Sequence, residues 1–477
     1  MIVEKLDTVR LEVSPKLDPT RRAQLGQFMT PGLTATFMAQ MFSDLPTHVE
    51  LLDAGAGMGA LTAAFVGEAC NRQVRPESIS VTCFEVDEGM AAILATTLEG
   101  CEKVCAEAGV EFRSRIIHDD YILHSAEPLH EERMFFNAAI LNPPYGKIRS
   151  NSTWRRALSS QSIETVNLYS AFVALASQQM EKGGQIVAIT PRSFCNGTYY
   201  QPFRRQILEE CGLSRLHVYE SRRSTFKDDD VLQENIIFHL RKGEDQGDVI
   251  LSTDKQEARA VPFEEIVRPG DKHQFIRLPV AGNSLAAKIQ ALPCSLADLG
   301  ISVSTGRVVD FRSREHLQKD PVGATVPMIY AQHFHDGKIE WPLEGFKKCN
   351  YLADSEETEK LMVPAGVYVI VKRFSAKEEK RRVVAALYDG GKAGFDNKTN
   401  YFHKNGGGLP QDVAEGLLIF LNSQPVDEYF RIFSGHTQVN ATDLRNLHYP
   451  SLEQLAAIGI SDLDPEEAVE EVLQART

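Results

Sequence analysis

The first half of the chain alternates short apolar runs with segments that favour helix, and this alternation restricts the fold more than any other feature. The runs typical of strands are Val49–Ala54, Ile79–Val86, Phe112–Ile117, Ala138–Asn142, Gln185–Thr190 and Val231–Leu240, with helical stretches such as Leu61–Ala69 and Tyr169–Met180 between them. Strands separated by helices predict an α/β fold with a doubly wound, mostly parallel sheet. Ligands of such sheets bind beyond the carboxyl ends of the strands, so we expect functional residues directly after the strands.

The pattern changes after Arg241–Asp248, a polar segment that contains glycine. Beyond it come short β-rich runs such as Val367–Val371, with one helix predicted at Asp412–Leu421. A chain of 477 residues is long enough for two or three domains. We predict an α/β domain at residues 1–245 and an α+β domain at residues 246–477.

The charge balance argues against a protein that binds polyanions nonspecifically. The chain carries 51 Lys and Arg against 65 Asp and Glu, a net charge of −14. Attraction of a whole protein to phosphate needs the opposite sign, although an enzyme that acts on nucleic acid needs only a local basic footprint. The last residues, Ser451 to Thr477, hold seven acidic residues against one arginine, which predicts a solvated helical tail.

Neither a membrane span nor a metal is expected. No apolar run approaches the ~20 residues that cross a bilayer, and the first residues mix charged and apolar side chains, so we expect a cytoplasmic protein. None of the eight cysteines forms a C-x-x-C pair. Cys101 and Cys105 have no nearby histidine or second cysteine pair that would complete a zinc site, so reduced, buried thiols are expected.

A glycine-rich turn follows the first strand, in the segment Leu51-Leu52-Asp53-Ala54-Gly55-Ala56-Gly57-Met58-Gly59. Glycines there allow a tight turn and close approach of a ligand to the amides of the following helix. The G-x-G-x-G spacing departs from the dinucleotide fingerprint G-x-G-x-x-G. Glu85, at the end of the next strand, can accept hydrogen bonds from both hydroxyls of a ribose. The pair indicates a ligand that carries a nucleoside, or a plain tight turn.

The tetrapeptide Asn142-Pro143-Pro144-Tyr145 ends the fourth run. Two prolines hold a rigid extended turn without amide donors, which leaves the carbonyls of Pro143 and of the Asn142 side chain able to face a substrate. Two acceptors that converge on an amino group take its two hydrogens and aim its lone pair at an electrophile. Tyr145 adds an aromatic plane that can stack on a ring. The alternative is a structural Pro-Pro loop with a packed tyrosine.

The ordered set of motifs resembles the gamma class of N6-adenine DNA methyltransferases, the TaqI-like enzymes of type II restriction-modification systems. The matching segments are Gly26–Pro31, Asp53–Gly59, Glu85, Asp120-Tyr121, Asn142–Tyr145, Asn167–Phe172, Gly183–Pro191 and Phe226. The resemblance continues more weakly through Ser304–Arg307 and Leu421–Ser423, so it covers most of the chain. It implies a Rossmann-like methyltransferase domain followed by a target-recognition domain.

The resemblance also implies a reaction and the residues that carry it. S-adenosylmethionine would donate a methyl group to N6 of an adenine flipped out of duplex DNA. Residues implied to bind the cofactor are Thr30, Asp53, Gly55, Gly57, Glu85, Val86, Asp120, Tyr121 and Phe172, and those implied in catalysis are Asn142, Pro143, Pro144, Tyr145 and Phe226. We expect Asp53, Glu85, Asp120 and Tyr145 around one cavity. Double-stranded DNA, a separate restriction endonuclease and a monomeric enzyme complete the expectation.

A basic stretch in the second half is a candidate DNA-binding footprint. Residues 366–410 hold nine Lys and Arg against four Asp and Glu, a local charge of +5, with aromatic residues interleaved. The candidates are Lys372, Arg373, Arg381, Arg382 and Lys398, with His436 and Gln438 near the end and Arg155 and Arg156 beside the catalytic motif. Any one of these side chains can equally be ordinary surface charge.

Two alternative functions would use the same chemistry on other substrates. The NPPY tetrapeptide also serves in enzymes that methylate a glutamine amide of release factors, since a planar amide presents the same NH₂ group. RNA methylation is the other alternative. The more than 200 residues that follow Leu240 favour DNA, because the protein methyltransferases are generally much shorter.

Overall fold

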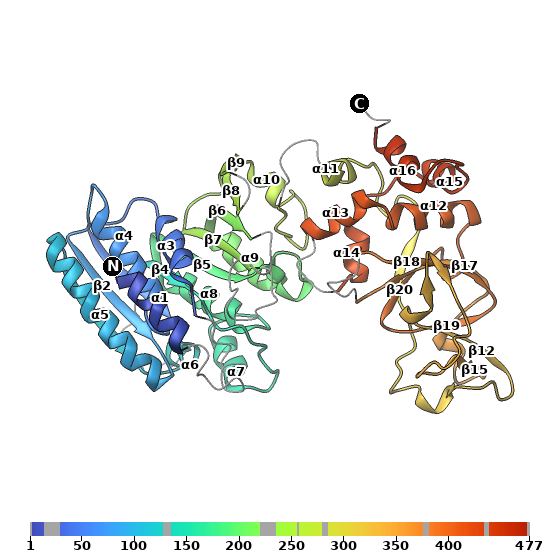
Figure 1. The fold of residues 1–477 in the computed structure, drawn as a ribbon, viewed down its shortest axis with the longest axis horizontal. Coiled ribbons are helices and arrows are strands. Elements are labelled where there is room, and N and C mark those ends of the chain that lie inside the picture. The colour runs from blue at the N-terminus through green and yellow to red at the C-terminus, as the bar shows by residue number, and fades with distance from the viewer. Residues whose placement is uncertain are drawn as a thin grey trace. The chain divides into compact units, whose positions relative to one another are not determined.

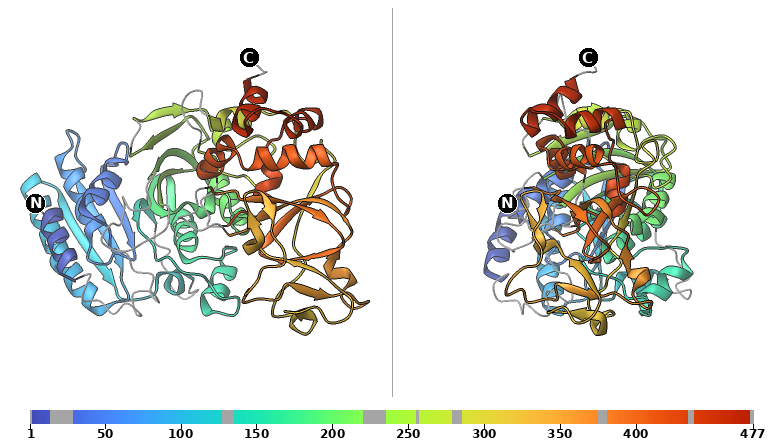
Figure 2. Two further views of the ribbon diagram at one scale, coloured as in Figure 1. Left: turned by 45° about the vertical axis from the view of Figure 1, so that its right-hand side comes forward. Right: turned by 90° about the vertical axis from the view of Figure 1, so that its right-hand side faces the viewer.

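The computed structural model describes residues 2–13, 29–126, 135–219, 235–254, 257–278, 285–374, 381–433 and 438–474. The chain forms two compact units, Met1–Leu278 and Pro279–Thr477 (Figures 1 and 2). Among the helices in these ranges, none is both long and apolar enough to cross a membrane. The eight cysteines are free thiols and six are buried, as expected.

The first unit is built on a nine-stranded sheet in the order β3-β2-β1-β4-β5-β7-β6-β8-β9. Its strands are β1 (His48–Ala54), β2 (Ser78–Phe84), β3 (Glu111–Ile117), β4 (Phe136–Leu141), β5 (Met180–Pro191), β6 (Cys211–Val218), β7 (Asn235–Lys242), β8 (Val249–Thr253) and β9 (Arg259–Val261). Strands β3, β2, β1, β4 and β5 are mutually parallel, and β7 lies antiparallel between β5 and β6. The predicted doubly wound α/β sheet is confirmed.

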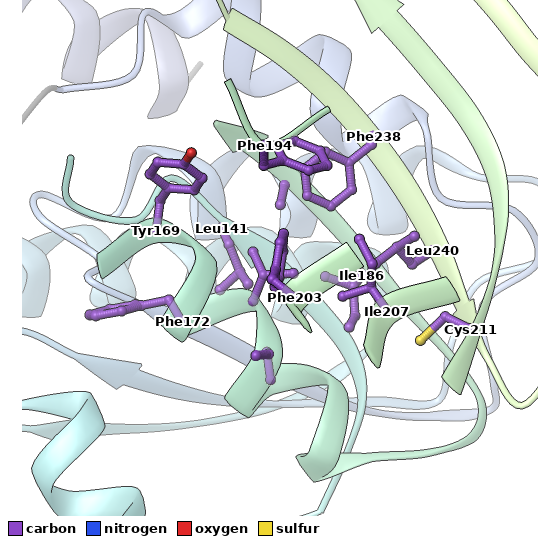
Figure 3. Close-up of a cluster of buried hydrophobic side chains, with 14 of the residues drawn as sticks. Leu141, Tyr169, Phe172, Ile186, Phe194, Phe203, Ile207, Cys211, Phe238 and Leu240 are labelled. Atoms are coloured by element: carbon purple, nitrogen blue, oxygen red, sulfur yellow. The ribbon is translucent and has the colours of Figure 1, made fainter. Parts of the chain in front are cut away.

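Helices cover both faces of this sheet. One face carries α1 (Ile2–Val13), α3 (Gly32–Gln40), α4 (Ala60–Asn71) and α5 (Glu88–Ala108), and the other carries α6 (Tyr121–Ala126), α7 (Thr153–Ser160), α8 (Leu168–Gln179) and α9 (Gln201–Glu210). A short helix, α10 (Phe263–Ile266), follows β9. Neighbouring strand residues serve opposite cores because successive side chains alternate between faces: Leu51 packs toward α4 and α5, and Leu52 toward α8. Figure 3 shows the second core, where Phe172 and Tyr169 of α8 lie near Phe203 of α9.

The boundary between the units lies further along the chain than the sequence suggested. The polar segment Arg241–Asp248 connects β7 to β8, and β8 pairs with β6 in parallel. Strand β9 then pairs with β8, so the residues just after 245 extend the first sheet. The first unit therefore continues to Leu278.

The second unit has two small sheets and a group of helices, the α+β composition that was predicted. One sheet has the order β10-β20-β17-β18-β14-β13 and the other β11-β15-β12-β19-β16. The strands are β10 (Ser302–Thr305), β11 (Leu317–Gln318), β12 (Thr325–Ile329), β13 (Phe334–His335), β14 (Lys338–Ile339), β15 (Tyr351–Ala353), β16 (Met362–Val363), β17 (Gly366–Lys372), β18 (Ala385–Gly390), β19 (Ala393–Phe395) and β20 (Thr399–His403). The helices are α11 (Leu285–Gln290), α12 (Gln411–Leu421), α13 (Gln424–Phe433), α14 (Ala441–Asn446), α15 (Leu452–Gly459) and α16 (Pro465–Gln474).

The acidic C-terminal segment is helical as predicted, but it is not merely a solvated tail. Helices α15 and α16 both pack against α12. Leu455, Ile458 and Val469 are buried there, because the apolar positions of these acidic helices fall on one face. At the crossing of α12 and α15 a Cβ on Gly416 would lie 1.8 Å from the Leu455 carbonyl oxygen, so the glycine permits the close approach.

Candidate active site

A pocket opens at the carboxyl edge of the parallel strands of the first unit. The segments after β1, β2, β3 and β4 all contribute to its wall, with α1, α3, α7 and α8. The space between atoms is about 1220 Å³, part of it open to solvent, which is ample for a cofactor the size of a nucleoside derivative. Four carboxylates and one arginine line the pocket: Asp7, Glu85, Asp119, Asp120 and Arg10. This wall favours a ligand that carries positive charge.

Hydrogen bonds to the next strand hold the glycine-rich turn open. The backbone N–H groups of Gly55 and Ala56 donate to the carbonyl of Phe84, at 3.0 and 2.9 Å. Gly55, Gly57 and Gly59 have φ values of +77°, +55° and +83°, which favour glycine. A Cβ on Gly59 would lie 2.7 Å from a methyl carbon of Leu94 in α5, so a larger residue there would have to displace that side chain.

Glu85 is tied to both sides of the turn. Its Oε2 accepts the N–H of Gly57 at 2.7 Å and its Oε1 accepts the N–H of Asp87 at 2.8 Å. The side chain is buried, and burial raises the pKa of its carboxyl, while those two N–H groups oppose the rise. Each oxygen keeps a second lone pair, so the carboxylate can still accept hydrogen bonds from a diol.

Asp120 and Tyr121 lie on the wall where the sequence predicted them. The Oδ1 of Asp120 caps α6 by accepting the N–H groups of Ile122 and Leu123, each at 3.0 Å. Its Oδ2 accepts the indole N–H of Trp154 at 2.9 Å. Trp154 was not predicted as a site residue; it lies on the pocket wall and directly precedes the Arg155-Arg156 pair.

Asn142 is half-buried at the wall, and its side-chain amide is held in one orientation. The Nδ2 group donates to the hydroxyl of Thr30 at 2.9 Å. The Oδ1 atom accepts the hydroxyl of Tyr145 at 3.4 Å. Thr30 is itself buried and comes just before α3. The amide carbonyl is therefore turned away from Thr30, and Thr30 helps to orient Asn142.

Helix α1 forms a part of the pocket that the sequence analysis missed. Val3, Leu6, Asp7 and Arg10 line it. Asp7 Oδ1 accepts the N–H of Gly32 at 3.2 Å and the Nε–H of Arg10 at 2.7 Å, which ties α1 to the start of α3. No local pattern marks these residues, because only the tertiary packing brings α1 to the strand ends.

The predicted cavity is only partly assembled as expected. The wall includes Thr30, Gly55, Gly57, Glu85, Val86, Asp120, Tyr121, Asn142, Pro144 and Phe172. Of the four residues expected around one cavity, Glu85 and Asp120 line it, whereas Asp53 and Tyr145 are not among the lining residues. Pro143 is buried and off the wall, and Tyr145 packs edge-on against Tyr169, with ring centroids 6.3 Å apart. Phe226 lies outside the described residues.

Asp53 is fully buried beneath the glycine turn. The hydroxyl of Thr62 donates to its Oδ2 at 2.6 Å, and its Oδ1 has no hydrogen-bond partner among the described residues. Burial, with a smaller contribution from the charge of Glu85, raises the pKa of Asp53 to about 7.

This shifted carboxyl predicts a pH-dependent stability. An unfolded aspartate has a pKa of about 3.9, so between about pH 4 and 7 the folded state holds a proton that the unfolded state has lost. The Asp53 contribution to stability is therefore greatest at low pH, falls as pH rises through this window, and is constant above it. We expect the free energy of unfolding of the first unit to fall more steeply from pH 5 to pH 8 in the parent than in Asp53→Asn.

Tryptophan fluorescence can measure this effect. The chain has two tryptophans, and in a Trp341→Phe background Trp154 reports on the first unit. Urea unfolding of parent and Asp53→Asn proteins, both in that background, isolates the contribution of Asp53 because the other titrating groups are shared. If the free energy of unfolding fell equally with pH in the two proteins, the raised pKa of Asp53 would be contradicted.

The candidate DNA-binding cations fall into several environments. Arg381 pairs with Glu466 at 2.9 Å, and Arg382 is buried with its backbone N–H bonded to Asp427. Arg155 donates to the carbonyl of Thr165, and Lys372 lies 6.0 Å from the ring centroid of Phe334. Arg156 and Lys398 are exposed, Arg373 and Gln438 are half-buried, and His436 lies outside the described residues. Within the described ranges, no cluster of three or more His, Cys, Asp or Glu residues is placed to hold a metal ion.

A parallel sheet with a glycine-rich turn, a buried acid and an Asn-Pro-Pro-Tyr corner at one edge defines an α/β protein that binds its ligand at the carboxyl ends of the strands. The Eco57I restriction-modification methylase family model matches residues 95–226. The chain is 48% identical to Type II methyltransferase M.PstI of Providencia stuartii over 469 residues, covering 95% of this chain and 92% of that protein. It is 44% identical to Type II methyltransferase M.BsuBI of Bacillus subtilis over 478 residues, covering 96% and 93%. The chain therefore belongs to the type II restriction-modification DNA methyltransferases.

A solved structure supports the fold alone. The ATP-dependent Type ISP restriction-modification enzyme LlaBIII bound to DNA aligns with a TM-score of 0.55 and 11% identity. The alignment covers 96% of this chain and 40% of that chain, so both units have counterparts in a longer enzyme.

Proposed function

We propose that the protein transfers a methyl group from S-adenosylmethionine to N6 of an adenine that has been flipped out of duplex DNA. The main observation in support is the orientation of Asn142 on the pocket wall. Its amide nitrogen donates to the hydroxyl of Thr30, so its carbonyl can accept a hydrogen bond from an amine at the pocket. Membership of a family of restriction-modification methyltransferases supports DNA as the substrate. The first unit would carry catalysis and the second unit target recognition.

The pocket residues fit the proposed cofactor in three respects. Glu85 offers a buried carboxylate for the ribose hydroxyls, and Asp120 stands on the same wall for the adenine amino group. Carboxylates exceed arginines on the wall by four to one, which suits a cationic sulfonium. S-adenosylmethionine supplies a methyl group that is already strongly electrophilic, so the protein chiefly has to position the attacking nitrogen.

The chain's own residues would then act on the target amine. The Oδ1 of Asn142 and the carbonyl of Pro143 would accept its two hydrogens, which aims the nitrogen lone pair into the pocket. Tyr145 would stack on the extruded base and replace part of the stacking lost from the duplex, about 1–3 kcal/mol per contact. No acidic base is required before transfer, because the amino proton can leave once the nitrogen has become positive.

The product identifies the reaction. Unmethylated plasmid DNA is incubated with the protein and S-adenosylmethionine labelled with tritium in the methyl group, and the DNA is digested to nucleosides. We expect the label to elute with N6-methyldeoxyadenosine and to map to a fixed sequence. Label in a methylated cytosine, or in RNA or protein offered alongside the plasmid, would contradict the proposal. A duplex with 2-aminopurine at the mapped adenine should gain fluorescence on binding if the base is flipped.

A further inference from the structure

One end of the six-stranded sheet in the second unit brings together segments that are distant in the sequence. Strand β10 ends there at Thr305 and β17 ends there at Lys372, whereas β20 begins there at Thr399. The antiparallel register places Thr305 opposite Asn400 and Lys372 opposite Thr399. The turn after β10, the residues after β17 and the residues before β20 therefore lie at the same end of the sheet.

Backbone hydrogen bonds lock these segments to one another. Asn397 donates its N–H to the carbonyl of Val308 at 2.8 Å, which joins the segment before β20 to the turn after β10. Arg373 donates its N–H to the carbonyl of Lys398 at 3.0 Å and its Nη1–H to the carbonyl of Asn397 at 2.8 Å. Val439 donates its N–H to the carbonyl of Arg373 at 2.8 Å, which adds the segment of Gln438. The result is a rigid surface assembled from four parts of the chain.

The turn after β10 holds an aromatic side chain out of the core. The N–H groups of Arg312 and Ser313 both donate to the carbonyl of Val309, at 2.9 and 3.0 Å. Val308 and Ser313 are buried on either side, whereas Phe311 is 76% exposed. The guanidinium carbon of Arg312 lies 5.4 Å from the centroid of the Phe311 ring.

A second exposed aromatic lies in the same set of segments. Phe374 directly follows Arg373 and is 46% exposed. Its backbone pairs with that of Gln438 in an isolated antiparallel β-bridge. Lys398 is also exposed. Two carboxylates of these segments, Asp310 and Asp396, share one counter-ion, since the ammonium of Lys348 lies 2.7 and 3.9 Å from them. We call Phe311, Arg312, Phe374, Lys398 and Gln438 the basic edge.

We propose that the basic edge is the surface through which the second unit contacts duplex DNA. This proposal rests on the proposed function and names the contacts of its target-recognition step. Arg312 and Lys398 bind backbone phosphates, which positions the duplex. Phe311 and Phe374 pack against bases or sugars, and Gln438 offers the donor and acceptor geometry that reads a base edge. Arg381 and Arg382 serve the fold, because the guanidinium of Arg381 pairs with Glu466 and the side chain of Arg382 is buried.

Strand β20 provides a matched pair of lysines for the test. Lys398 directly precedes this strand and Lys404 directly follows it, so they stand about 20 Å apart along an extended strand. Both are exposed. Lys398→Ala and Lys404→Ala therefore remove the same charge from the two ends of one strand, and only the first belongs to the basic edge.

The measurement is the dissociation constant for a fluorescent duplex cut from a plasmid that the parent methylates, determined by anisotropy over a series of KCl concentrations. We expect Arg312→Ala and Lys398→Ala each to weaken binding roughly tenfold and to reduce the salt slope by about 0.9. Phe311→Ala should weaken binding roughly tenfold without changing the slope, because stacking releases no counter-ions. Lys404→Ala should leave both quantities unchanged.

Equal effects of Lys398→Ala and Lys404→Ala, or unchanged binding by all three edge variants, would overturn the proposal. Cofactor affinity and the melting temperature are measured alongside, because they must stay at the parental values for the comparison to report on the surface. The outcome is independent of the base that is modified. If no adenine is methylated, the proposed reaction fails, and the binding comparison on plasmid fragments still decides where the second unit holds DNA.

Discussion

Replacing Asn142 with alanine is expected to lower the methyl-transfer rate by about 10²–10³-fold, the loss typical when one preorganised transition-state hydrogen bond is removed. The carbonyl that would accept a hydrogen from the target amine disappears, and the nitrogen lone pair is no longer aimed. Cofactor affinity should stay within a few-fold of the parent, because Glu85 and the glycine turn are untouched. Single-turnover transfer of labelled methyl to plasmid DNA measures the rate, and calorimetry measures cofactor binding.

Tyr145→Phe is the matched control for this variant. It removes the hydroxyl that donates to Asn142 Oδ1 at 3.4 Å and keeps the ring that would stack on the base. We expect a loss of only a few-fold in rate, since a long hydrogen bond contributes little. If Asn142→Ala abolished cofactor binding together with transfer, the residue would belong to the cofactor site and its catalytic assignment would fail.

Glu85→Ala is expected to weaken binding of S-adenosylmethionine by about 100-fold. The estimate assumes two hydrogen bonds from ribose hydroxyls to a charged acceptor, at about 1.5 kcal/mol each, and tenfold in affinity for every 1.4 kcal/mol. The same substitution frees the N–H groups of Gly57 and Asp87, so the turn itself also loses its anchor. Isothermal titration with S-adenosylmethionine provides the measurement.

Two further variants separate ribose recognition from folding. Glu88→Ala removes an exposed carboxylate from the first turn of α5 and should leave the affinity unchanged. Glu85→Gln preserves the shape of the side chain and one acceptor oxygen, so it should fold like the parent and still bind the cofactor more weakly. Parental affinity in a folded Glu85→Gln protein would show that the carboxylate does not hold the ribose.

The central strands could be predicted because each is a short apolar run bounded by helix-forming residues. Strands β6, β8 and β9 were missed. The runs of five and three residues in β8 and β9 carry little pattern of their own and are strands only because β6 offers an edge. That addition is also why the first unit ends at Leu278 and not near residue 245.

The candidate site likewise contains residues that could be predicted from the sequence and residues that could not. Glu85, Asp120 and Asn142 directly follow strands, so their position along the sequence already places them at one edge of the sheet. Arg10 and Trp154 reach the pocket from helices, through packing that has no local signature. Charge counting likewise did not distinguish Arg381, whose partner Glu466 is 85 residues away, from the exposed Lys398.

The hydrogen bond between Asn142 and Thr30 has a consequence for the energy of activation. An unrestrained amide would have to give up rotamer freedom at the moment a base arrives, and that entropic cost would add to the barrier. Here the folded enzyme has already fixed the side chain before any nucleotide enters. A flipped adenine would therefore meet an acceptor that needs no reorganisation, so more of the binding energy is left to lower the transition state.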